Sequence, residues 1–232
     1  MSDTFEIIEG NLSAQSVDNV LARLDAFCKN ATGQTITLDL STLGFVDPYG
    51  MALLCLIGRR LSRQFWDIDC TLPDHPDVES YLTRMGVFAL LKEGVSLPRL
   101  PETGRPPVEN ESLIEVCEIS GRTDVENALT RVESRVVSIL ERELNYSVRE
   151  ITWFKNVIAE LCHNIVDHSG DRGYLAAQRY TNHKQGRKFA VISVCDLGIG
   201  IRESLATRYD VSSWSHGMAI SNAVKKTFSR DT

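Results

Sequence analysis

The sequence predicts a two-part protein, an α/β half followed by an α+β half. The first half alternates apolar segments of period two with segments of helical spacing, which favours a sheet backed by helices. The second half places one strand and two helices before a pair of adjacent strands. Between the halves, residues 96–112 contain four of the seven prolines, which exclude a helix or a central strand there. We therefore expect domains at 1–95 and 113–232, joined by a linker at 96–112.

Three strands and three helices are expected in the first half. The strands are short segments rich in β-forming residues, and the helices repeat apolar residues every three to four positions. The expected strands are residues 4–9, 35–40 and 66–72. The expected helices are residues 16–28, 49–61 and 77–91, with a break in the last one near Gly86.

The second half is expected to open with a strand at 113–119. A helix at 123–144 follows, since Val125, Leu129, Val132, Val136 and Leu140 form one stripe. The remaining expected elements are a helix at 148–167, strands at 174–180 and 189–196 with a hairpin turn between them, and a helix at 218–228.

The composition is that of an ordinary globular protein. The chain has 232 residues, a formal net charge of −6 and 43% hydrophobic residues. A pI near 5.4 is a poor match to a nucleic-acid binder. The six cysteines form no CxxC pair, the acidic start MSDTFEIIEG does not resemble a signal peptide, and no apolar stretch is long enough to cross a membrane. We expect a soluble, cytoplasmic protein with reduced thiols.

The segment ELCHNIVDHSG at 160–170 places three polar side chains on one face of the second helix. Glu160, Asn164 and His168 are spaced i, i+4, i+8, beside an expected core stripe that includes Leu161 and Val157. A carboxylate can activate a nucleophile, and an amide oxygen suits Mg²⁺. The alternative is a solvated polar face. Zinc is disfavoured, because no HExxH or Cys–His cluster is present.

The segment FAVISVCDLGIGI at 189–201 ends a strand in an aspartate followed by two glycines. Asp196 could accept a hydrogen bond from an exocyclic amine such as that of adenine, and Gly198 and Gly200 allow a ligand to approach the backbone. A dinucleotide fingerprint is disfavoured because Glu203 replaces its third glycine, and the GxxxxGK[ST] pattern of a P-loop is absent. A strand followed by a tight turn remains the simpler alternative.

In order and spacing, these two segments resemble the N-box and G1 box of the GHKL ATPase superfamily. The resemblance covers roughly residues 113–232 and implies a Bergerat-type α/β sandwich that binds ATP. It implies that Asn164 holds Mg²⁺, that Glu160 activates the attacking water or hydroxyl, and that Asp196 binds the adenine amine. The other residues that it assigns to the nucleotide site are Asp167, His168, Gly198, Gly200 and Ile201. The family's second glycine box would follow residues 225–232, so we expect a truncated fold with weakened nucleotide affinity.

The first half resembles a STAS domain, the fold of anti-anti-sigma factors. The matching segments are TITLDLSTLGFVDPYGMALLCLIGRRL and YLTRMGVFALL. In that family a serine of a DSSG turn is the phosphoacceptor, whereas Tyr49 occupies the position here. Serine phosphorylation at that position is therefore excluded, and an interaction or packing module is favoured.

Together the resemblances suggest a Mg-ATP-binding regulator of a protein partner, itself STAS-like or related to a sigma factor. The chain would act as a serine/threonine protein kinase of the anti-sigma-factor type or as a simple ATPase, and a homodimer is compatible with either. Neither nucleic acid nor a membrane is an expected partner. Two alternatives stay open: a non-catalytic interaction module with a degenerate ATP site, and a DNA-associated GHKL ATPase.

Overall fold

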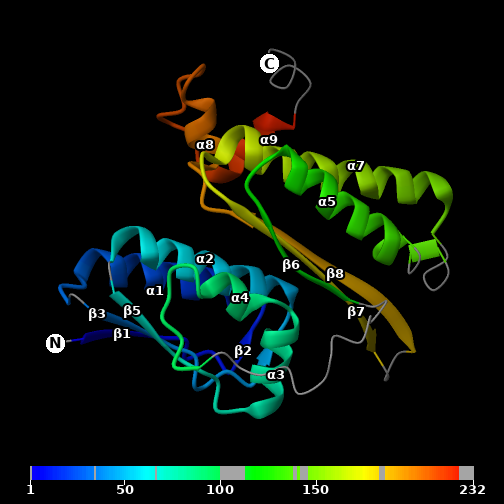
Figure 1. Cartoon of the computed structure of the whole chain (residues 1–232). Coiled ribbons are helices and arrows are strands. Elements are labelled where there is room, and N and C mark those ends of the chain that lie inside the picture. The colour runs from blue at the N-terminus through cyan, green and yellow to red at the C-terminus, as the bar shows by residue number, and fades with distance from the viewer. Residues whose placement is uncertain are drawn as a thin grey trace.

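The computed structural model describes residues 2–33, 35–65, 67–99, 113–137, 140–141, 146–182 and 186–224. The chain forms a mixed α/β structure with parallel strands in its first half and antiparallel strands in its second half (Figure 1). Figure 1 also shows helices between the two larger sheets and helices over the outer face of the antiparallel sheet.

The larger sheet of the first half is parallel, in the order β1-β3-β5. Its strands are β1 (Ser2–Glu6), β3 (Thr35–Asp39) and β5 (Asp67–Thr71). A second, two-stranded parallel sheet joins β2 (Asn11–Leu12) to β4 (Phe45–Val46). The parallel pairs need crossover connections, which the helices between the strands provide.

Four helices accompany these strands. They are α1 (Val17–Asn30), α2 (Pro48–Gln64), α3 (Pro76–Arg84) and α4 (Val87–Leu91). The long helix α2 begins where Asp47 accepts a hydrogen bond from the Gly50 backbone N–H at 2.9 Å, with Pro48 in the first turn. Gly86 has φ of 79° and separates α3 from α4, which confirms the predicted break.

The sheet of the second half is antiparallel, in the order β6-β7-β8. Its strands are β6 (Leu113–Ile119), β7 (Gly173–Asn182) and β8 (Arg187–Asp196). The helical segments are α5 (Arg122–Arg131), η1 (Val132–Val137), α7 (Val148–Asn164), η2 (Ile165–Ser169), α8 (Gly200–Leu205) and α9 (His216–Ala223). The segments η1 and η2 are π-helical, so each widens the helical path at the end of an α-helix.

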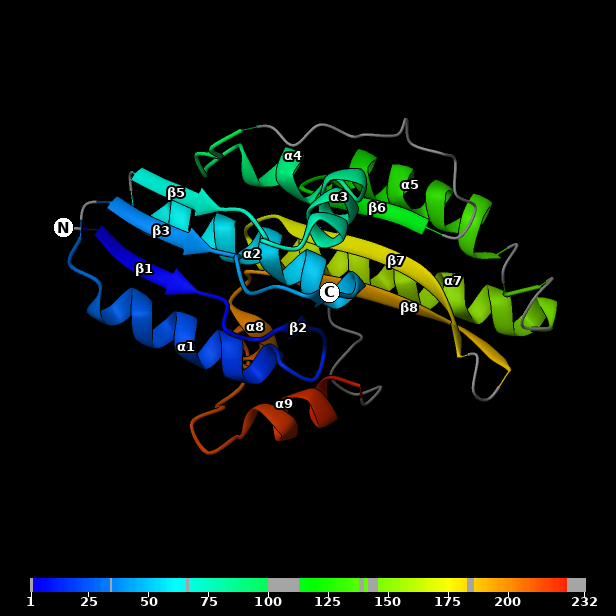
Figure 2. The same cartoon turned by 90° about the horizontal axis from the view of Figure 1, so that it is seen from below.

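Both faces of the antiparallel sheet are covered. Leu175 and Ala177 of β7 pack into the core formed with α5 and α7. Tyr174 and Ala176, the alternate residues of the same strand, pack into the core formed with α2. Helix α2 therefore lies between the two larger sheets, as Figures 1 and 2 both show. Because side chains alternate between the two faces along β7, this strand contributes to two separate cores, one on each face of the sheet.

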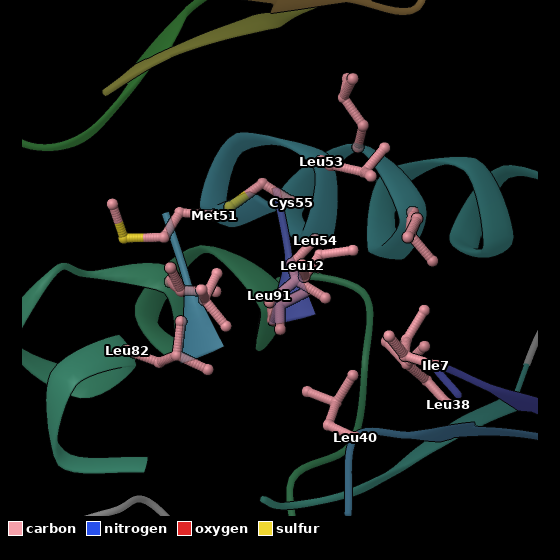
Figure 3. Packing of buried hydrophobic residues seen from close by; sticks show 14 of the residues in the cluster. Ile7, Leu12, Leu38, Leu40, Met51, Leu53, Leu54, Cys55, Leu82 and Leu91 are labelled. Atoms are coloured by element: carbon pink, nitrogen blue, oxygen red, sulfur yellow. The ribbon is translucent and has the colours of Figure 1, made fainter. Parts of the chain in front are cut away.

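Helix α2 is buried on nearly every side. Met51, Leu54 and Ile57 have no exposed surface, and Leu53 and Cys55 are only 2% exposed. Leu54 of α2 belongs to the same buried cluster as Leu12 and Leu91, and Figure 3 labels all three. A helix that is apolar all round must be covered on all sides, and the sheet β6-β7-β8 supplies the covering that the first half lacks.

Several predicted boundaries require correction. The strand expected at 4–9 ends at Glu6, because its parallel register with β3 also ends there, at Asp39. The elements β2, β4 and α8 are too short to have been predicted. The helix expected at 123–144 is α-helical as far as Arg131, continues as η1 and is α-helical again at the described residues 140–141.

Parts of other predicted elements fall outside the described residues. These are residues 138–139 and 142–144 of the first long helix, 183–185 of the hairpin turn, 225–228 of the last helix and 100–112 of the linker. At the start of the expected linker, Ser96 still pairs with the N-terminal sheet. It donates its N–H to Ile68 O at 2.7 Å and accepts from Cys70 N at 2.9 Å.

Among the residues that the structure describes, no helix is both long and apolar enough to cross a membrane.

Candidate functional site

The residues expected to form the site come from two segments, the end of α7 and the loop after β8. Helix α7 starts in a capping box, in which Ser147 accepts from the Glu150 N–H and the Glu150 carboxylate accepts from the Ser147 N–H at 2.7 Å. Ile158 and Cys162 are buried, so Glu160 and Asn164 lie on the opposite, exposed face.

One part of the expected core stripe of α7 is wrong. Val157 is 57% exposed and Leu161 is 43% exposed, although both were expected to pack with Ile158. The buried residues of α7 are Ile151, Ile158 and Cys162, a narrower stripe than expected. Trp153, four residues before Val157, is also 61% exposed. An apolar strip therefore lies beside the polar residues of the expected site.

The expected i, i+4, i+8 face changes at Asn164, where α7 gives way to η2. A π-helical turn contains more residues than an α-helical one, so four steps from Asn164 rotate His168 by less than an α-helix would. Asp167 and His168 are exposed, and the segment ends at Gly170, whose φ is 67°. Asp167 forms an ion pair with Arg122 at 3.7 Å, and both side chains are exposed, so this pair contributes little to stability.

Strand register places Asp196 on the same face of the sheet as α7. Asp196 pairs directly with Gly173, and residues that face each other across two strands project to the same side. A Cβ atom on Gly173 would lie 2.5 Å from Ile165 Cδ1, so this side is the one that η2 covers. Val194, two residues earlier, packs into the same core, in keeping with strand alternation. The Asp196 carboxylate is exposed.

Gly198 brings the loop after β8 against the end of η2. A Cβ atom there would lie 2.6 Å from Ser169 Cα and 2.5 Å from Asp196 Oδ1, so no larger residue fits without a shift. The Gly198 N–H donates to Asp196 Oδ1 at 2.6 Å, which leaves the other carboxylate oxygen for a ligand. Gly200 has φ of 81°, a conformation that favours glycine. Ile201 is exposed one residue later.

The structure brings the two expected segments into contact, but no contact described in it joins Asn164, Asp167 or His168 directly to the loop at 196–201. The end of η2 and the loop at 196–201 are in direct contact through Ser169 and Gly198. Glu160 lies one turn before Asn164 on the exposed face of α7, and no contact described in the structure joins it to the β8 loop. An acid or base function for Glu160 would therefore depend on a ligand that reaches across from this loop.

Sequence reasoning missed Ser169, Asp171 and Gly173, which hold the two segments in place. Ser169 is 7% exposed, donates its hydroxyl to Asp171 O at 2.7 Å and accepts from the Asp171 N–H at 3.0 Å. The sequence signal that could have found them is the run Ser169, Gly170 and Asp171, because these residue types commonly form the end of a helix and the turn after it.

A magnesium ion fits only part of this arrangement. Within the described residues, no group of three or more His, Cys, Asp or Glu side chains is placed to hold a metal. Asn164 offers an exposed amide oxygen, and Mg²⁺ commonly uses one or two protein ligands together with waters and phosphate oxygens. The residues present therefore fit a magnesium ion that arrives with a nucleotide better than an independent metal site.

The side chain at position 49 packs against a core that residues of both halves form. Tyr49, in the first turn of α2, is half-buried and packs against the same core as Cys195 and Leu197. Burial raises the pKa of the Tyr49 phenol, and the neighbouring Cys195 adds to the shift.

Comparisons of the chain with protein-family models, with curated proteins and with solved structures give no match.

Proposed function

We propose that the chain binds Mg-ATP where the end of α7 meets the loop after β8, and that nucleotide binding controls a protein partner. The proposal assigns a Bergerat-type fold to residues 113–232 and a STAS-like fold to residues 1–95. The observation that carries it is the packing of Gly198 on Ser169, which places the exposed Asp196 beside the helix end that follows Asn164.

The chain's own residues would divide the task as follows. The free oxygen of Asp196 would accept a hydrogen bond from the adenine amine. Gly198 would hold the loop against Ser169, and Gly200 would leave its backbone open to the ligand, since an added Cβ atom there meets Glu203 Oε2 only at 3.6 Å. Asn164 would present its amide oxygen to a magnesium ion, which neutralises phosphate charge when bound. Glu160 would accept a proton from a water or from a partner's hydroxyl, so hydrolysis and transfer to serine or threonine share one base.

The test is Mg²⁺-dependent ATP binding by calorimetry on the full chain and on two asparagine variants. Asn164→Ala should abolish the Mg²⁺-dependent part of binding. Asn30→Ala is the matched control, because Asn30 is exposed at the end of α1 and bonds only to the Ala26 carbonyl in the described structure. Equal binding by both variants would reject the assignment of Asn164, and no binding by the folded wild-type protein would reject the proposal.

A non-catalytic interaction module is the second candidate. The half-buried Tyr49 supports it, because a residue held between the two halves is poorly placed to accept phosphate. This candidate predicts a folded protein that binds a protein partner equally well with and without Mg-ATP. A partner affinity that changes on addition of Mg-ATP would reject it.

A further inference from the structure

Asp171 links the end of η2 to the N-terminal half. Its carboxylate pairs with Arg59 through Oδ1 at 3.2 Å and with Arg63 through Oδ2 at 2.6 Å. The Asp171 side chain is 6% exposed, whereas those of Arg59 and Arg63 are 34% and 51% exposed. A nearly buried carboxylate held by two guanidinium groups is a stronger contact than an exposed ion pair, because it is hydrogen-bonded on both oxygens.

The charge on Asp171 is maintained despite its burial. Burial alone would raise the pKa of this carboxyl, but the Arg172 backbone N–H and the guanidinium groups of Arg59 and Arg63 outweigh it and lower the pKa. Removal of the arginines would leave a buried, poorly compensated carboxylate, which is costly in a folded protein. The Asp171 segment is therefore expected to move when the arginines are removed.

A short chain of contacts connects Asp171 to the loop of the proposed nucleotide site. The backbone of Asp171 is hydrogen-bonded in both directions to the Ser169 hydroxyl. The Gly198 backbone packs directly against Ser169, because a Cβ atom added to Gly198 would lie only 2.6 Å from Ser169 Cα. A displacement of Asp171 is thus transmitted to Ser169 and from there to the loop that carries Asp196.

One further feature sets Arg59 apart from an ordinary surface arginine. Its Nε is buried and has no hydrogen-bond partner in the described structure. A buried donor without a hydrogen-bond partner lowers the stability of the folded protein. We attribute the observed position of the Arg59 side chain to its ion pair with Asp171, which compensates for this loss. Arg63, one turn further along α2, reaches the same carboxylate from a more exposed position.

We infer that Arg59 and Arg63 are positioning residues for the nucleotide site, acting through Asp171, Ser169 and Gly198. This inference rests on the proposed function and extends it, because it makes nucleotide affinity depend on the docking of the STAS-like half. Helix α2 carries both arginines. A partner that pulled α2 away from the second sheet would weaken nucleotide binding.

The test compares three variants of the full chain. Arg59→Ala/Arg63→Ala removes the contacts, and Arg59→Lys/Arg63→Lys keeps the charges but loses the planar guanidinium groups. Arg23→Ala is the matched control, since Arg23 pairs with Glu9 at 2.9 Å within the first half and both side chains are largely buried. Each variant is examined for its melting temperature, for Mg-ATP affinity by calorimetry, and for hydrogen exchange without nucleotide at residues 169–173 and 196–200.

The double alanine variant should bind Mg-ATP about tenfold more weakly and exchange faster at both segments. The double lysine variant should recover part of the affinity. The control should lose stability without a change in either readout. If the double alanine variant melts lower but keeps its affinity and exchange, the arginines only join the two halves and the inference is overturned.

The same experiment separates this inference from the proposed function. If the wild-type protein binds no ATP, the proposed function fails, and hydrogen exchange alone then decides the link. Faster exchange at 196–200 in the double alanine variant would support the link, and unchanged exchange there would overturn it.

Discussion

Replacement of Gly198 by alanine should loosen the contact between η2 and the loop after β8. The added Cβ atom would lie 2.6 Å from Ser169 Cα and 2.9 Å from Ser169 Cβ, well inside van der Waals contact. Because one of these atoms belongs to the backbone, a rotamer change cannot relieve the overlap. Overpacking of this kind costs about 1–3 kcal/mol. In a chain of this length that cost corresponds to a melting temperature about 2–12 °C lower.

Calorimetric unfolding and Mg-ATP titration of Gly198→Ala would check this expectation. The matched control is Gly10→Ala, because a Cβ atom at Gly10 meets a single atom, Thr42 O, at 4.0 Å. The control should stay within about 0.5 kcal/mol of the wild-type stability. If Gly198→Ala melts with the control and binds nucleotide like the wild type, the close packing of this loop on η2 is not what positions the site.

Two further predictions concern groups whose pKa the fold shifts. Hydrogen bonds from the Ser120 side chain and backbone lower the pKa of Asp124 in the first turn of α5, so Asp124→Ala should cost about 0.3–1 kcal/mol at neutral pH, a small value because solvent screens this site. That difference should begin to shrink as the pH falls below the ordinary pKa of an aspartate, about 3.9, and should be lost below the lowered pKa of the folded state, because the stabilisation belongs to the charged form. A difference that persists in acid unfolding curves would contradict this origin. Burial raises the pKa of Cys70 to about 12 and that of Cys162 to about 11. Iodoacetamide should therefore modify both thiols far more slowly in the native protein than in urea, as followed by mass spectrometry. Equal rates of modification in the two conditions would show that these segments open readily.

Long elements with a clear period could be predicted from the sequence. The periodicity of residues 113–119 and the apolar run at 49–61 each correspond to an observed element, β6 and α2. The short strands β2 and β4 have two residues each and carry no period. Their pairing depends on tertiary contacts, such as the donation from Gly44 N to Gly10 O at 2.8 Å, which no local pattern reveals.

The expected site could be predicted as two segments, but the manner of their contact could not. Periodicity placed Glu160 and Asn164 on one exposed face, and the strand pattern ended at Asp196, as observed. The sequence does not reveal the transition from α7 to η2, because α-helices and π-helices contain the same residue types. The contact between Gly198 and Ser169 is a pairing between distant segments, which depends on the register of β7 with β8.

The apolar character of α2 contained a further signal that separate analysis of the two halves left unused. In an α/β unit standing alone, a helix that covers a sheet is expected to keep a polar outer face. The run MALLCLIG in α2 has no such face, and Met51, Ala52, Leu54 and Ile57 are all fully buried. This run therefore already required a second apolar surface, which β7 and β8 provide. The charged residues Arg59 and Arg63 appear only where α2 reaches the edge of that surface, and there they meet Asp171. The same helix thus combines the apolar contact that joins the halves with the polar contact through which docking can influence the proposed nucleotide site.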